Sequence, residues 1–216
     1  MTLPDASIKI VVGLTLAFIA YYLESILRWF GIGLAASGPA MTIFWKTVAG
    51  VLIIGIIWLF EKRTLASINF RRPSEKDITW AFYFWGLSMS WYWVASLFLP
   101  PEQSEGVSTI ARMHPLIVLG IILTSATVEE LFFRGYLIER FKQLTGRIWF
   151  GVVVSYAIFL IPHVQFFGPS WLLYHGFGAT LLYVFYLWRR NLVAVMWLHL
   201  LGNLPILIPT FMEYFS

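Results

Sequence analysis

Long apolar blocks separated by short polar connections dominate the chain. Seven can be marked, at residues 8–30, 40–60, 78–99, 115–138, 148–162, 171–188 and 192–211. Most approach the roughly 20 residues that a helix needs to cross a bilayer, although the fifth is short. The chain has no internal repeat and no linker long enough to divide it. The pattern predicts an all-α, polytopic membrane helical bundle of about seven transmembrane helices, forming a single integral membrane domain over residues 1–216.

The composition supports a membrane protein. Of the 216 residues, 59% are hydrophobic and only 12% are charged, whereas a soluble domain carries roughly 25% charged residues. Aromatic residues make up 19%, including 11 Trp, which is typical of a protein that lines two lipid–water interfaces. The chain has no cysteine, which excludes disulfides, thiolate nucleophiles and cysteine metal ligands.

The distribution of lysine and arginine predicts an orientation. With seven spans, eleven basic residues fall on one face of the membrane, and Arg28, Lys46 and Arg112 fall on the other. The positive-inside rule then places the N-terminus in the cytoplasm and the C-terminus outside, and we expect the plasma membrane of a prokaryote. The basic segment 61–77 reads as a cytoplasmic loop that rests on anionic headgroups. These loops account for the net charge of +4 without a nucleic-acid partner.

Charged side chains inside a span are costly and usually functional, and the fourth span contains three. Glu130 and Arg134 are four residues apart, so we expect them to share a helical face and pair. In an α-helix Glu129 is turned about 100° away, which predicts a carboxylate without an internal partner, suited to act as a general base. The alternative, that both glutamates reach cytoplasmic water, would require them to bridge about 17–20 Å.

Two later spans carry further polar side chains. His163 lies near the end of the fifth span, and His199 and Asn203 lie four residues apart in the seventh. Each alone is typical of helix packing. At the rise of an α-helix, these residues and Glu129 lie about 12–24 Å from the cytoplasmic ends of their spans. If the three helices pack together, they form one polar cavity within the membrane.

This set of side chains fits hydrolysis of an amide. A glutamate and a histidine can deprotonate a water, and a second histidine and an asparagine can donate hydrogen bonds to the oxyanion. No Gly-x-Ser-x-Gly elbow is present, and we expect Ser125 to cap or pack. A catalytic zinc held by Glu129 or Glu130 with His163 and His199 is an alternative. Because no His-Glu-x-x-His motif occurs, we expect no metal or other cofactor.

Three short motifs, each on its own apolar span, follow one another along residues 115–205. They read Glu129-Glu130-Leu131-Phe132-Phe133-Arg134, Phe159-Leu160-Ile161-Pro162-His163 and His199-Leu200-Leu201-Gly202-Asn203. In this order they resemble the CPBP family, also called CAAX proteases or Abi proteins. The resemblance implies an all-helical, glutamic-type intramembrane endopeptidase similar to the eukaryotic enzymes that trim prenylated CAAX proteins. By that likeness, Glu129 and His163 would activate the water, His199 and Asn203 would form the oxyanion hole, and Glu130, Arg134 and Phe159 would support them.

The resemblance implies a membrane-anchored protein or peptide as substrate, cleaved near its C-terminus in the manner of a CAAX protease or of a protein-sorting protease. A proton-coupled transporter remains an alternative, because glutamate, histidine and arginine within a membrane are also typical of proton relays. Transporters usually show repeats, and none is found here. A third reading is a non-catalytic scaffold or immunity protein, in which the polar groups only hold helices together. Release of a cleaved peptide distinguishes the enzyme from both.

Overall fold

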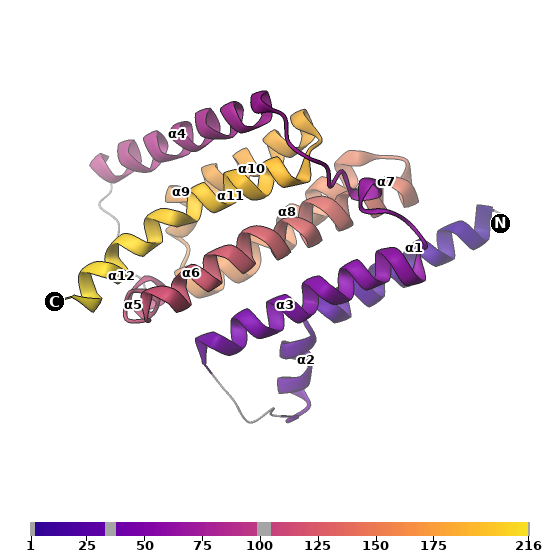
Figure 1. The fold of residues 1–216 in the computed structure, drawn as a ribbon, viewed down its shortest axis with the longest axis horizontal. Helices are drawn as coiled ribbons and strands as arrows, with labels where there is room; N and C mark the ends of the chain where they lie inside the picture. The colour runs from indigo at the N-terminus through magenta and orange to yellow at the C-terminus, as the bar shows by residue number, and fades with distance from the viewer. Residues whose placement is uncertain (1–2, 33–37, 99–104, 216) are drawn as a thin grey trace.

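The computed structural model describes residues 3–32, 38–98 and 105–215, and every regular element in this part of the chain is a helix. The long helices lie side by side along one direction, with the N-terminus and α7 at one end of the bundle and α5, α12 and the C-terminus at the other (Figure 1). The expected all-α membrane bundle is confirmed.

The helices follow the apolar blocks of the sequence. The first two blocks form α1 (Leu3–Tyr21), α2 (Leu23–Trp29), α3 (Pro39–Gly55) and the π-helical η1 (Ile56–Phe60). A connection with the 3₁₀ turn η2 (Leu65–Ile68) leads to α4 (Glu75–Phe98) and α5 (Glu105–Ala111). The remaining elements are α6 (Pro115–Thr124), the π-helical η3 (Ser125–Leu137), α7 (Ile138–Thr145), α8 (Ile148–Phe167), α9 (Trp171–Tyr174), α10 (Gly176–Arg189), α11 (Leu192–Asn203), η4 (Leu204–Ile206) and α12 (Leu207–Tyr214).

Within the described residues, four continuous helical stretches are long and apolar enough to cross a membrane. They are Pro39–Phe60, Pro115–Thr145, Ile148–Phe167 and Leu192–Tyr214. The pair α1–α2, bent by 69°, makes a fifth if it is one broken span. The third and sixth apolar blocks form α4 and α9–α10, which are not among the stretches that are both long and apolar enough to cross a membrane. The helix α10 has only 14 residues. The number of seven spans therefore stays a prediction.

Several block boundaries differ from the expected ones. The fifth block was expected to end at Pro162, but α8 continues past this proline to Phe167. The sixth is divided at His175, between α9 and α10. The seventh is interrupted by the 3₁₀ turn η4, which contains Pro205. Proline has no N–H for the helical ladder, so a change of helix type at this point is expected. The end of the third block, residue 99, lies outside the described residues.

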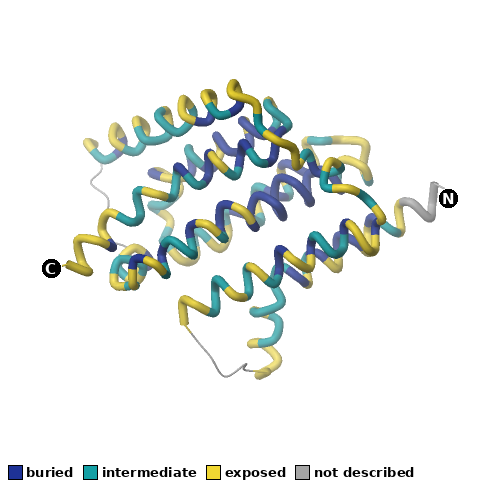
Figure 2. Tube along the Cα trace, in the orientation of Figure 1, coloured by how far each residue is buried: buried dark blue, intermediate teal, exposed yellow. Residues whose placement is uncertain are grey.

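The central helix of the bundle is η3, and every residue in it except Thr127 is buried. Figure 2 shows this burial as a dark stretch in the middle of the molecule. Its Phe132, Tyr136 and Leu137 are fully buried in an apolar core. Outward-facing positions carry large exposed apolar side chains instead, for example Leu59 and Phe98. An apolar outer surface is what a helix bundle presents to lipid.

Charged side chains close the end of the bundle at which the N-terminus lies. We call the first group the end cluster: Glu61, Ser67, Tyr136 and Arg140. Arg140 donates to Glu61 through Nε at 2.9 Å and Nη2 at 2.6 Å, and Tyr136 Oη donates to the same carboxylate at 2.8 Å. Arg140 also donates to Ser67 Oγ at 3.0 Å and is fully buried. The cluster therefore fixes α7 to the connection that follows α3.

A second charged group anchors the start of α4. Ser74 and Asp77 form a capping box, in which the Ser74 N–H donates to Asp77 Oδ2 at 2.8 Å and the Asp77 N–H donates to Ser74 Oγ at 3.2 Å. Arg189, at the end of α10, donates to Asp77 Oδ1 at 2.7 Å. Asn191 donates to the other oxygen at 3.3 Å. One carboxylate thus joins α4 to the turn between α10 and α11.

Candidate active site

The backbone of η3 differs from the α-helix that the sequence suggested. Its 13 residues, Ser125–Leu137, are π-helical, with hydrogen bonds to the fifth residue along the chain. Consecutive residues of a π-helix turn through a smaller angle than in an α-helix, because each turn contains more residues. The expected angle of about 100° between Glu129 and Glu130 is therefore wrong for this segment. Helices of this type often occur at functional sites.

Glu130 links two helices through one oxygen. Arg134 Nη1 donates to Glu130 Oε1 at 2.8 Å, so the pairing expected from their spacing is confirmed. The same oxygen accepts a hydrogen bond from His199 Nδ1, on α11, at 2.6 Å. Glu130 and Arg134 are fully buried, and His199 is 6% exposed. Glu130 thereby fixes the orientation of the His199 imidazole, and not only the charge of Arg134.

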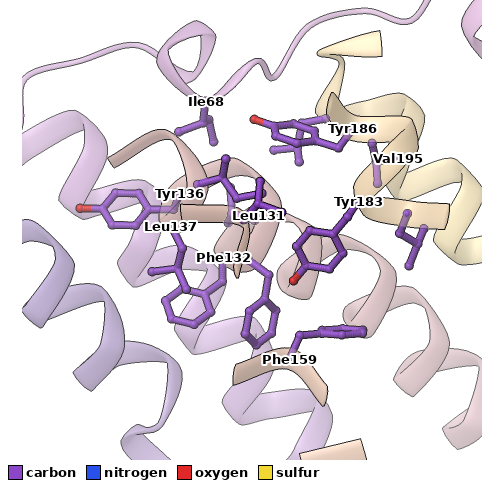
Figure 3. Close-up of a cluster of buried hydrophobic side chains, with 14 of the residues drawn as sticks. Ile68, Leu131, Phe132, Tyr136, Leu137, Phe159, Tyr183, Tyr186 and Val195 are labelled. Atoms are coloured by element: carbon purple, nitrogen blue, oxygen red, sulfur yellow. The ribbon is translucent and has the colours of Figure 1, made fainter. Parts of the chain in front are cut away.

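Two aromatic rings enclose the Arg134 guanidinium. Its central carbon lies 4.1 Å from the ring centroids of both Phe159 and Tyr183. Cation–π contacts of this kind are strongest away from water. Figure 3 shows Phe159 and Tyr183 next to each other within the buried cluster. Phe159 therefore packs on Arg134, and so does Tyr183 on α10, which was not identified from the sequence.

Glu129 has a partner that the sequence analysis missed. Lys46 Nζ, on α3, donates to Glu129 Oε1 and, at 2.6 Å, to Ser125 Oγ. The prediction that Glu129 lacks a partner within the protein is therefore wrong. Ser125 accepts from a lysine as well as packing in the helix. The other oxygen, Glu129 Oε2, is buried and makes no hydrogen bond to the described part of the protein.

Lys46 was assigned to the outer face in the charge count, but it lies inside the apolar stretch Pro39–Phe60. The signal that could have identified it was present in the sequence: a single charge within an apolar block, which is the criterion that selected Glu129. Its removal from the count leaves two basic residues on the outer side, so the predicted asymmetry becomes slightly stronger.

His163 lies in α8, with its Nδ1 atom 2.7 Å from the carbonyl oxygen of Phe159. A carbonyl can only accept, so Nδ1 carries the proton and Nε2 of the neutral ring is an acceptor. The ring also stacks on Trp171, with centroids 4.7 Å apart. His163 is therefore held in the tautomer that a general base requires.

The two histidines lie on either side of Phe159, whose ring centroid is 4.4 Å from that of His163 and 6.5 Å from that of His199. His199 in turn bonds to Glu130, the residue that follows Glu129. Three of the four residues expected in the site are thus brought together, from η3, α8 and α11. The fourth, Asn203, is the last residue of α11 and is half-buried. Its side chain makes no hydrogen bond with any residue that the structure describes, so its place in the site rests on the sequence motif.

The fit to a metal is poor among the described residues. No group of three or more His, Asp or Glu side chains there is arranged to hold a metal ion. The alternative of a zinc held by the glutamates and histidines of this site therefore gains no support from their arrangement.

The segment that contains the candidate site matches a known protein family. Residues 111–205 match the family described as type II CAAX prenyl endopeptidase Rce1-like. No curated protein and no solved structure matches the chain. The matched segment contains all three motifs and the helices that carry them, η3, α8 and α11. The match covers rather less than half of the chain, and over residues 111–205 this integral membrane protein is similar to the Rce1-like CAAX proteases, as the order of the three motifs predicted.

Proposed function

We propose that the protein is an intramembrane endopeptidase of the glutamic type, which cleaves a peptide bond near the C-terminus of a membrane-anchored protein or peptide. The observation that carries this proposal is the arrangement of His163 and His199 around Phe159, with His199 bonded to the neighbour of Glu129, within the segment that matches the family. Buried titratable groups that converge in this way are typical of active sites.

In the proposed reaction, Glu129 and His163 take a proton from water. Glu129 Oε2 and His163 Nε2 are the atoms suited to this step, because Glu129 Oε1 and His163 Nδ1 are engaged by Lys46 and by the Phe159 carbonyl. The water oxygen attacks the carbonyl carbon of the scissile bond. When the tetrahedral intermediate collapses, the C–N bond breaks and the proton moves to the leaving amine.

His199 and Asn203 are assigned to the oxyanion. Since His199 Nδ1 donates to Glu130, only Nε2 can face a substrate. With Nδ1 bonded to Glu130, Nε2 donates a hydrogen bond when the ring carries both protons. Glu130 is therefore a positioning residue, and Arg134 and Phe159 in turn hold Glu130 in place.

The proposed orientation has a cytoplasmic N-terminus and an external C-terminus, in a prokaryotic plasma membrane. The two termini lie at opposite ends of the bundle (Figure 1). The connections with most of the basic residues meet at the N-terminal end, where Arg63 bonds to Gln143 and Arg71 bonds to the carbonyl of Arg189. Such a concentration of charge at one end supports the assignment.

The test is peptidase activity of the purified protein in lipid nanodiscs. The substrates are two sets of membrane-anchored peptides, one with prenylated CAAX C-termini and one with hydrophobic C-terminal anchors. Glu129→Ala is assayed in parallel, with and without a chelator. We expect cleavage of at least one set, lost in Glu129→Ala and unaffected by the chelator. Loss with chelator and recovery with zinc would support a metal mechanism instead.

The same assay separates the two other classes of function. Uptake of a labelled substrate into sealed vesicles without any cleavage would support a proton-coupled transporter. Biological activity that survives Glu129→Ala would support a scaffold or immunity protein.

A further inference from the structure

Lys46 is an unusual residue for its position. It lies seven residues after the start of α3 at Pro39, which corresponds to a depth of about 10 Å along the helix. A lysine at such a depth usually extends toward the nearest headgroups. Lys46 instead directs its ammonium group inward, to Glu129 and Ser125 on η3. The Lys46 side chain is 23% exposed and that of Glu129 only 7%.

We propose that Lys46 is a positioning residue of the active site, whose ammonium group keeps the Glu129 carboxylate ionised and oriented before a substrate arrives. This inference rests on the proposed role of Glu129 as general base. A base must be ionised to accept a proton, and an isolated carboxylate in an apolar interior takes up a proton instead. The nearby ammonium group compensates the negative charge, so that the ionised form persists.

The geometry of the contact leaves the carboxylate able to react. Lys46 bonds to Oε1, whereas Oε2 is without a hydrogen bond from the described residues. The carboxylate is therefore held by one oxygen and can accept a proton from water on the other. An ammonium group has three N–H donors, and the second goes to Ser125 Oγ one turn earlier. This second bond restricts the position of the ammonium group.

Other titratable groups surround Glu129, but none replaces Lys46. Tyr21 and Tyr22 approach from the first apolar block, His163 from α8 and His199 from α11. On η3 itself, Glu130 follows directly and Arg134 lies one turn away. Arg134 is committed to Glu130 and to its two aromatic rings. Within the described part of the chain, Lys46 is the cation that bonds directly to Glu129.

The contact between α3 and η3 does not depend on Lys46 alone. A Cβ atom built on Gly50 would lie 3.1 Å from Val128 Cγ2, which shows that the two helices also pack closely one turn further along α3. A purely structural role for Lys46 would therefore predict only a change in stability when it is replaced. A positioning role predicts a change in the pH dependence of catalysis.

The first arm of the test measures the cleavage rate against pH for wild type, Lys46→Met and Lys46→Arg. Without the cation, Glu129 stays protonated up to a higher pH, so the acidic limb of the Lys46→Met profile should move up by about 1–3 pH units. Lys46→Arg retains the charge, and its limb should stay near that of wild type. Lys142→Met removes the same charge from an exposed position on α7 and should leave the profile unchanged. A Lys46→Met limb at the wild-type pH would overturn the proposal.

The second arm does not depend on cleavage. Hydrophobic carbodiimides modify protonated carboxyl groups in membranes, and mass spectrometry of peptides locates the adduct. At neutral pH, labelling of Glu129 should rise several-fold in Lys46→Met relative to wild type and Lys142→Met. Acidification should raise labelling in wild type, which shows that the reagent reaches the site.

The two arms separate the two proposals. If no peptide is cleaved but labelling rises in Lys46→Met, the proposed protease function fails and the role of Lys46 in holding the charge of Glu129 stands. If cleavage requires Glu129 but neither the labelling nor the acidic limb changes in Lys46→Met, the protease function stands and the role of Lys46 is refuted.

Discussion

Two groups of buried charged residues lie along the continuous helical stretch Pro115–Thr145. They differ in how many of their polar atoms make hydrogen bonds. In the end cluster, both carboxylate oxygens of Glu61 accept hydrogen bonds, from Tyr136 and Arg140. In what we call the mid-helix cluster (Lys46, Glu129, Glu130, Arg134 and His199), each glutamate bonds through Oε1 and leaves Oε2 without a partner among the described residues.

The difference separates a structural group from a reactive one. A fully bonded carboxylate has no lone pair left for a reactant, and its loss leaves a buried cation unpaired. A half-bonded carboxylate costs stability but remains able to accept a proton. Arg134 follows the same pattern, since its Nε and Nη2 atoms also lack hydrogen bonds from the described residues. Substitutions in the two clusters should therefore have opposite consequences for activity and stability.

The largest expected effect is on catalysis. Glu129→Gln keeps the size of the side chain but removes the base, so the cleavage rate should fall by about 10²–10⁴-fold. The thermal unfolding temperature should remain close to that of wild type, because the Lys46 side chain is 23% exposed and its ammonium group can extend toward the headgroups when its charged partner is removed. Rates are measured in nanodiscs at neutral pH. A loss smaller than about tenfold would contradict the assignment of Glu129 as the base.

The equivalent substitution in the end cluster is Glu61→Gln. It leaves the fully buried Arg140 without a charged partner, a change that typically costs about 3–5 kcal/mol. Thermal unfolding in detergent should shift to a clearly lower temperature, while the rate of cleavage well below that temperature stays near wild type. The control is Glu61→Gln combined with Arg140→Met, which removes the unpaired cation and should regain much of the stability. Equal unfolding temperatures for Glu61→Gln and wild type would show that the end cluster is not structural.

A smaller effect is expected at Gly135, which lies between the two clusters. A Cβ atom there would come within 2.7 Å of Leu192 Cδ2, at the start of α11. The Leu192 methyl is the end of a fully buried side chain, so Gly135→Ala should force it into another rotamer at a cost of about 1–2 kcal/mol. We expect a lower unfolding temperature, with cleavage well below that temperature near wild type. Leu192→Val in the same chain should restore part of the stability; failure to restore it would point to a cause other than this contact.

The smallest expected effect concerns Asp77, at the charged end of the bundle. Burial alone would raise the pKa of Asp77, but the Ser74 N–H, the Arg189 guanidinium and the Ser74 hydroxyl outweigh it and hold the pKa below its usual value. Because the folded-state pKa is lowered, the stabilisation is present above the unfolded value of about 3.9 and is lost as the pH falls through the folded one.

Asp77→Asn should therefore lower stability at neutral pH by about 1 kcal/mol, as for other helix caps. The difference in unfolding temperature between Asp77→Asn and wild type should shrink in acid. A difference that is constant from neutral to acidic pH would show that the charge of Asp77 is not what stabilises the cap.

Sequence analysis succeeded where the determinant is local. The apolar blocks become helices, and the spacing of Glu130 and Arg134 predicts their ion pair. The partners that complete the mid-helix cluster are not local, because Lys46 is 83 residues from Glu129 and His199 is 69 from Glu130. No spacing rule relates residues at such distances, and only the packing of α3 and α11 on η3 brings them together.

The local geometry of η3 was also beyond the sequence. Apolar periodicity indicates that residues 115–138 form a helix. An α-helix and a π-helix differ only in whether the backbone hydrogen bonds join residues four or five positions apart. The apolar pattern does not distinguish between them, and the side chains of η3, among them Phe132, Tyr136 and Leu137, lie in a core that several helices form together.

The π-helical backbone of η3 has a consequence for protein engineering. A designer who copies Glu-Glu-x-x-x-Arg onto an idealised α-helical scaffold would reproduce the chemistry of the side chains but not their directions. The two adjacent carboxylates, which here bond to α3 and to α11, would be rotated further apart and would leave the helix in other directions. The transferable unit is therefore the 13-residue backbone with its unusual register, and successful grafts should be judged first on whether that register forms.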